Sequence, residues 1–254
     1  MTCSLISRAW VYRTRKYLFS TLTFTNENLP TWHSVVATPK PNKGSRKRRL
    51  PAASCPPSPS HAPLSSYVTS LNLSSTPSRA MSGDFESALI QASTHFSAFV
   101  NLNSLTLSGI SFTVFWGTPL KACFGPLGET VRKLRLSECS LDWKVLAFLK
   151  LFTHLEELEL NRNTWTDSRF SKLTGVLQKG QDPVLRGSFT ALNFTNARIG
   201  LLGCLSTTRV EYHTITLGSN RSSTFSPLDP LFAKCKDHLM TLIFQTPYSH
   251  NDGQ

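Results

Sequence analysis

The stretch that decides the fold is VRKLRLSECSLDWKVLAFLKLFTHLEELELNRNTW, residues 131–165. Near its start, Leu134 and Leu136 alternate with polar residues, which predicts a strand with a period of two, and the same alternation returns near its end. Between them, Asp142 precedes an apolar run at 143–152 with helical spacing and is placed to cap its first turn. The stretch therefore predicts strand, turn, helix and strand, which together form one repeat of a solenoid.

The strand signature recurs along the chain from residue 67 onward. Its intervals of 23 to 34 residues bracket the length of leucine-rich repeats, about 20 to 29 residues, with two longer turns. Strands joined by helices in a constant sense form a parallel sheet. We therefore predict an α/β fold, an irregular leucine-rich-repeat-like solenoid without a regular asparagine ladder, to which Asn161 is the nearest approach. The first inward residues of its strands are predicted to be Leu71, Leu105, Leu134, Leu158, Leu192, Ile215 and Leu242.

Alignment of the central strands also predicts what faces outward. If Leu134 and Leu158 are neighbours, Lys133 lies beside Glu157 and Arg135 beside Glu159, about 5 Å apart. Small polar residues flank these pairs, so the face offers hydrogen-bonding groups that suit a polar protein surface better than a phosphate backbone. A second interpretation is that the pairs only stabilise the sheet. The candidate partner-binding face comprises Thr106, Lys133, Arg135, Glu157, Glu159 and Asn193.

Basic residues are concentrated before the repeats. The net charge is +12, and residues 1–63 hold ten of the 27 basic residues but one of the 15 acidic residues. Residues 37–66 are rich in Pro, Ser and basic residues, so we predict a disordered basic linker between an N-terminal segment at 1–36 and a repeat domain at 67–254. A cluster in this linker is a candidate nuclear-import signal, a weak nucleic-acid patch or a solvated charge run: Lys43, Arg46, Lys47, Arg48 and Arg49.

Residues 5–19 predict a helix, and a β-rich piece follows at 18–25. The Arg-rich, acid-poor helix fits either an organelle-import segment or the last helix of a small helical domain. The run ISRAWVYRTRKYLFSTLTFTNENLP resembles the tail of an F-box domain and the linker behind it in fungal F-box proteins. The Leu-Pro-rich first helices of that domain would lie before Met1, so we expect residues 1–36 to hold an F-box remnant.

The repeats extend this resemblance. Residues 67–74, 128–160 and 210–242 are similar to the irregular leucine-rich-repeat halves of fungal F-box proteins. The resemblance implies a substrate-recruiting subunit of a cullin-RING ubiquitin ligase, in which the F-box holds the adaptor and the repeats hold a protein target. The alternatives are a free-standing leucine-rich-repeat scaffold or inactive fragment, and a nuclear or nucleic-acid-associated protein acting through the basic arm.

Motifs for enzyme chemistry are missing from the sequence. It has no Gly-rich phosphate loop, nucleophile elbow or zinc-protease helix, so we expect no catalysis and no cofactor. The six cysteines show neither zinc-site spacing nor a disulfide framework, so we expect no metal. No apolar run reaches the roughly 18 residues of a membrane span. We expect a cytoplasmic or nuclear protein whose partners are proteins, with neither a membrane nor nucleic acid as the main partner.

Overall fold

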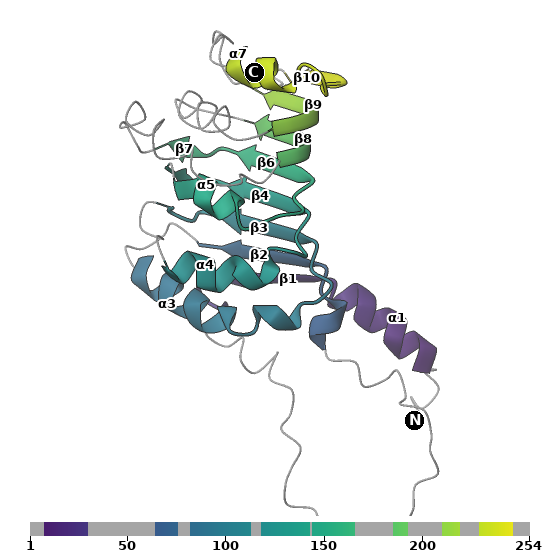
Figure 1. Cartoon of the computed structure of the whole chain (residues 1–254). Helices are drawn as coiled ribbons and strands as arrows, with labels where there is room; N and C mark the ends of the chain where they lie inside the picture. The colour runs from purple at the N-terminus through teal and green to yellow at the C-terminus, as the bar shows by residue number, and fades with distance from the viewer. Residues whose placement is uncertain are drawn as a thin grey trace, which may run out of the picture.

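The computed structural model describes residues 8–29, 64–75, 82–112, 118–142, 144–165, 185–192, 210–218 and 229–245. Within these ranges the chain is an α/β protein built around a large parallel sheet (Figure 1). The strands of this sheet are β1 (Thr21–Thr25), β2 (Ser70–Ser74), β3 (Ser104–Ser108), β4 (Lys133–Ser137), β6 (Glu157–Asn161), β8 (Leu185–Leu192), β9 (Val210–Gly218) and β10 (Thr241–Gln245).

The eight strands lie in chain order across the sheet, and every pairing between them is parallel. Two short strands, β5 (Ser140–Leu141) and β7 (Thr164–Trp165), form a second parallel sheet. The described α-helices are α1 (Arg8–Leu18), α3 (Ser82–Ser93), α4 (Thr118–Phe124), α5 (Lys144–Leu149) and α7 (Asp229–Cys235). Short 3-10 helices are η3 (Leu64–Tyr67), η4 (Phe96–Ala98) and η5 (Gly125–Leu127).

The predicted inward row is confirmed in the central strands. Leu71, Leu105, Leu134 and Leu158 are direct neighbours on consecutive strands, and each side chain is buried. Leucines two residues further along these strands form a second buried row. This follows from the alternation of side chains across a strand, which sends every second residue into the core.

The prediction for Leu192 is wrong. Leu158 is paired with Phe189, whereas Leu192 pairs with Asn161 and is only half-buried. β8 begins before the predicted strand, at Leu185, and carries an irregularity between Gly187 and Ser188 that shifts its register against β9. The inward positions of β8 are occupied by Phe189 and the small Ala191. A prediction based on leucines therefore assigned the opposite face of this strand to the core.

Gly187 lies at this register shift and allows a close backbone contact. Its φ is +90°, a backbone conformation that residues with a side chain rarely adopt. A Cβ atom at this position would lie 1.8 Å from the carbonyl oxygen of Glu156. β8 therefore approaches the segment before β6 more closely than any residue with a side chain permits. Leu242 aligns with the buried Ile215 of β9, as the predicted inward row requires, but it is 40% exposed in β10 at the edge of the sheet.

The sheet begins earlier in the chain than predicted. β1 lies within the N-terminal segment 1–36 and pairs with β2 in full register, from Thr21 beside Ser70 to Thr25 beside Ser74. The sheet thus crosses the predicted boundary between residues 1–36 and 67–254. The preceding α1 falls within the helix predicted at 5–19 and projects near the β1 end of the sheet (Figure 1).

Aromatic side chains from the helices and loops fill the core beside the sheet. The ring of Phe148 in α5 makes edge contacts with Phe112, Phe124 and Phe152, at centroid distances of 5.2, 5.3 and 5.0 Å. α5 begins behind Asp142, whose Oδ1 accepts a hydrogen bond from the Lys144 backbone N–H at 2.9 Å, so the predicted cap is confirmed. None of the described helices is long and apolar enough to span a membrane.

Candidate protein-binding face

The side of the sheet opposite the apolar core carries polar side chains in aligned rows. Pairing between neighbouring strands places these side chains beside one another from β1 to β9, and most are half-buried or exposed. We call this surface the polar face. Its first row is Thr21, Ser70, Ser104, Lys133, Glu157, Ser188 and Thr214, and its second row is Thr23, Asn72, Thr106, Arg135, Glu159, Thr190 and Thr216.

Two ion pairs occupy the middle of the polar face, as predicted. Lys133 Nζ lies 2.7 Å from Glu157 Oε1, and Arg135 Nη2 lies 2.5 Å from Glu159 Oε1. Both pairs join β4 to β6 at positions that the register aligns. The hydrogen bond to Glu159 raises the pKa of Arg135, so this guanidinium stays charged.

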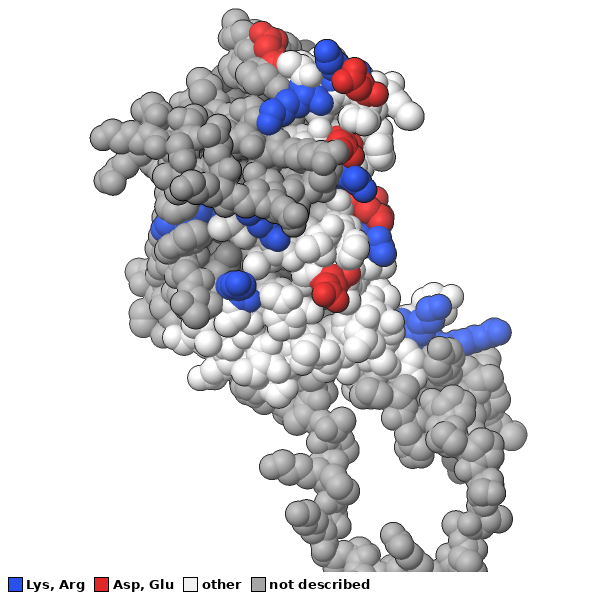
Figure 2. Space-filling model, viewed as in Figure 1, with Lys and Arg blue, Asp and Glu red and all other residues white. Residues whose placement is uncertain are grey.

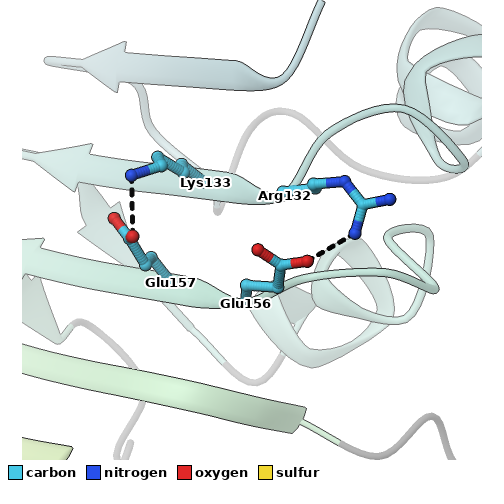
Figure 3. Close-up of polar contacts among 4 residues, drawn as sticks. All are labelled: Arg132, Lys133, Glu156 and Glu157. Carbon is cyan, nitrogen blue, oxygen red and sulfur yellow. Dashed lines mark hydrogen bonds and ion pairs between the residues drawn. The ribbon is translucent and has the colours of Figure 1, made fainter.

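A third pair lies just before the two strands. Arg132 binds Glu156 beside the Lys133–Glu157 pair, as Figure 3 shows. This contact was not predicted from the sequence, although the same separation of 24 residues relates both pairs. The alignment of β4 with β6 therefore extends to the residue before each strand.

Charge on the polar face is balanced within the sheet. Beyond the pairs of β4 and β6, Arg186 Nε binds Glu211 Oε2 at 2.9 Å, which joins β8 to β9. Figure 2 shows basic and acidic side chains alternating along this part of the molecule. Exposed pairs of this kind contribute about 0.2 to 1 kcal/mol each, so their main effect is to cancel the local field.

The predicted site residues divide into three groups. Thr106 lies between Asn72 and Arg135 in the second row, and with the two ion pairs it forms one continuous surface. Asn193 lies outside the described residues, and β8 contributes Thr190 to that row instead. The candidate nuclear-import cluster also lies outside the described residues: Lys43, Arg46, Lys47, Arg48 and Arg49.

Left-handed turns follow three neighbouring strands at equivalent positions. Gly109, Glu138 and Arg162 each come directly after the last residue of their strand, with φ values of 67°, 55° and 51°. The backbone N–H of Gly109 donates to Ser137 O at 3.0 Å, and that of Glu138 donates to Asn161 O at 2.9 Å. The parallel alignment therefore continues past the strand ends.

A buried asparagine joins two of these turns. Asn163 is fully buried; its Oδ1 accepts from the Cys139 backbone N–H at 2.8 Å, and its Nδ2 donates to Leu136 O at 2.9 Å. Asn161, the predicted nearest approach to an asparagine ladder, belongs to the strand itself. The signal for Asn163 was its place in the pattern L-x-x-L-x-L-x-x-N that starts at Leu155, where leucine-rich repeats carry asparagine or cysteine.

Buried ionisable groups elsewhere are held in their neutral forms. Burial raises the pKa of the Cys139 thiol from 9.0 to about 11 and also raises the pKa of Cys235. Burial raises the pKa of the Tyr212 hydroxyl, which has no hydrogen-bond partner among the described residues. Within the described ranges, no group of three or more His, Cys, Asp or Glu could hold a metal ion.

No protein-family model and no curated protein matches the chain. Among solved structures, the chain is similar to a crystal structure of a protein from Bacteroides fragilis that was a structural genomics target. The similarity covers 75% of this chain and 67% of that chain, at 11% sequence identity and a TM-score of 0.35. A similarity this low carries no information about the function of this chain.

Proposed function

We propose that this chain is a non-catalytic protein-binding scaffold that presents the polar face to a protein partner. The observation that carries the proposal is the alignment of hydroxyl, amide and charged side chains across β1 to β9. Neighbouring strands lie about 4.8 Å apart, so the two rows form a regular array of hydrogen-bond donors and acceptors. Such an array on a rigid sheet is suited to recognition of another polar surface.

Charge balance favours a protein over a nucleic acid. The basic side chains in the two rows of the polar face, Lys133 and Arg135, are both bound to carboxylates on β6, and Arg186 is bound to Glu211 on β9. A phosphate backbone is bound by cations that can release its counterions, whereas cations already paired with glutamates would have to give up their partners. A protein surface offers donors and acceptors of both kinds and matches the mixed character of this face.

A repeat architecture of the leucine-rich type is part of the proposal. The spacing L-x-x-L-x-L-x-x-N/C-x-L fits residues 155–165 with Trp165 at its last position, and residues 131–141 with Val131 at its first position. The contacts of Asn163 with the preceding unit support this architecture, because a buried amide that satisfies backbone groups of its neighbour ties one repeat to the next.

The resemblance to fungal F-box proteins supports a narrower proposal, a substrate-recruiting subunit of a cullin-RING ubiquitin ligase. In that proposal the segment containing α1 corresponds to the tail of an F-box, and the polar face holds the target. An affinity purification of the full chain distinguishes this role from that of a free-standing scaffold. Recovery of the ligase adaptor and cullin supports the ligase role, and recovery of a target without them leaves the scaffold.

The general proposal is tested with a face variant and a matched control. Thr106→Arg with Thr190→Arg places two bulky cations on the polar face, whereas Ala122→Arg with Ala147→Arg places the same two cations at exposed positions on α4 and α5. After cross-linking and purification, we expect a partner that the wild type and the helix variant recover and that the face variant loses. Recovery of the same partners by all three proteins contradicts binding through the polar face.

A further inference from the structure

β10 differs from the other strands because it is apolar and exposed on both sides. It is the last strand in the sheet order, and all five of its residues are exposed. The exposed fractions are 40% for Leu242, 42% for Ile243 and 52% for Phe244, and Met240 just before the strand is 87% exposed. At the opposite edge, β1 has Phe24 buried at 7% and only threonines on the polar face.

The register shows which side each apolar residue occupies. Leu242 and Phe244 align with Ile215 and Leu217 of β9, so they continue the two core rows of the sheet. Ile243 aligns with Thr216 and is the one apolar residue in the second row of the polar face among the described strands. An apolar residue at that position, on the last of the strands that the structure describes, is where another strand would gain most by adding to the sheet.

We infer that β10 pairs with β10 of a second copy of this chain, antiparallel about a two-fold axis at Ile243. In this arrangement Leu242 lies opposite Phe244 of the second copy, Phe244 lies opposite Leu242, and Ile243 lies opposite its own counterpart. Thr241 lies opposite Gln245 at each end, so polar residues meet polar residues and apolar residues meet apolar residues. The strand is therefore complementary to itself in this one orientation.

Other properties of β10 also fit pairing with a copy. The sequence Thr241–Gln245 contains no charged residue, so two copies bring no like charges together. It also lacks the proline, lysine or bulge with which proteins commonly protect an exposed edge. A head-to-tail addition of β10 to β1 of another copy would place Ile243 against Thr23, which is a polar neighbour, and would leave both ends open to growth.

Sedimentation of the full chain over about 1 to 100 µM tests the dimer, since an interface of one strand and a few flanking side chains is small for a stable complex. We expect a monomer–dimer equilibrium in this range. Ile243→Lys should raise the dissociation constant at least about tenfold, because the two-fold axis brings the two lysines together. Thr23→Lys on the edge strand β1 is the matched control and should leave the equilibrium unchanged.

Oxidative cross-linking of the same chain tests the register. Residues directly opposite in an antiparallel pair have Cβ atoms about 4.5–5.5 Å apart, close to disulfide distance. Ile243→Cys should therefore give a covalent dimer, whereas Leu242→Cys, which faces residue 244 of the second copy, should stay at the level of the wild type. A monomer at every concentration, cross-linking at 242 rather than 243, or assembly beyond the dimer that Thr23→Lys abolishes overturns the inference.

Discussion

Two of the three residues that adopt left-handed conformations after the strands are not glycine. Glu138 and Arg162 have φ values of 55° and 51°, and this conformation costs an L-residue roughly 1 to 2 kcal/mol. Their side chains meet at 3.4 Å in an exposed pair that offsets little of this cost. The conformations are held by the ladder of backbone hydrogen bonds that continues from each strand.

The first prediction concerns this turn. Glu138→Gly and Arg162→Gly should each raise the free energy of unfolding by up to about 1 kcal/mol, after the extra entropy of glycine in the unfolded chain is subtracted. Gly109→Ala, at the equivalent position, should do the opposite, because its Cβ would lie 2.1 Å from Ser75 O. Chemical denaturation of the three variants gives the values. A loss of stability in both glycine variants would contradict the shared geometry.

The second prediction concerns Asn163. Asn163→Ala leaves the Cys139 N–H and the Leu136 carbonyl without their hydrogen bonds in the core, so it should cost about 2 to 4 kcal/mol. The control is Asn72→Ala, which removes an exposed amide bound to Thr23 Oγ1 at 3.3 Å and should change stability by less than about 0.5 kcal/mol. Equal effects of the two substitutions would show that Asn163 does not tie the turn after β6 to the turn after β4.

The third prediction concerns alkaline pH. The unfolded chain releases the Cys139 proton near its ordinary pKa of 9.0, whereas the folded protein keeps it up to about 11. The folded state therefore binds more protons between these values, and the free energy of unfolding falls as pH rises through this window. The raised pKa values of Cys235 and Tyr212 act in the same direction.

Chemical denaturation at pH 7 to 11 measures how steeply the free energy of unfolding falls with pH in the wild type and in Cys139→Ala. The variant should show a smaller loss of stability above pH 9, whatever its stability at neutral pH. An identical slope in both proteins would mean that Cys139 is accessible to water in the folded state.

Among the elements, β4 and β6 agree most closely with the sequence-based prediction. Their register could be predicted because each strand alternates leucine with charge, and a slip of one residue would turn every side chain to the wrong face. The phase of β8 could not be predicted from leucines, because its inward positions beside β6 are occupied by Phe189 and Ala191. Likewise, pairing of β1 with β2 joins segments that are separated by about 50 residues.

Some residues of the candidate site could be predicted from the sequence, and others could not. Lys133, Arg135, Glu157 and Glu159 could be placed from two strands with one spacing. The buried Asn163 follows a motif that the sequence contains, but its identification required attention to the position after the strand. The apolar edge at β10 depends on which strand is last in the sheet, and a pattern of leucines does not contain that information.

The fourth prediction tests the register of β4 and β6 directly. Arg135→Glu places a like charge beside Glu159 and should lower the free energy of unfolding by about 0.5 to 1 kcal/mol, because Arg135 is exposed and Glu159 is half-buried. The double reversal, Arg135→Glu with Glu159→Arg, should recover most of that loss. A double-mutant cycle at low salt gives the coupling energy. Equal stability of the single and double variants would mean that the two side chains do not meet.

At the scale of the whole molecule, the parallel sheet separates two environments. One side is filled by leucines and by the aromatic contacts around Phe148, and the other carries rows of polar side chains from β1 to β9. Core residues of this kind stabilise the fold whatever the protein binds. The side chains of the polar face are not needed to fill the core. Their ordered hydroxyl, amide and paired charged groups therefore form the surface on which we expect a partner to bind.

Lysine acetylation with and without a purified partner tests the central claim most directly, because two exposed lysines report on the two sides of the sheet. Lys133 lies on the polar face in β4, and Lys121 lies in α4 on the helix side. If the polar face binds the partner, the complex should slow acetylation of Lys133 several-fold and leave the rate at Lys121 unchanged. Protection of Lys121 with Lys133 still reactive would place the partner on the helices and contradict the account.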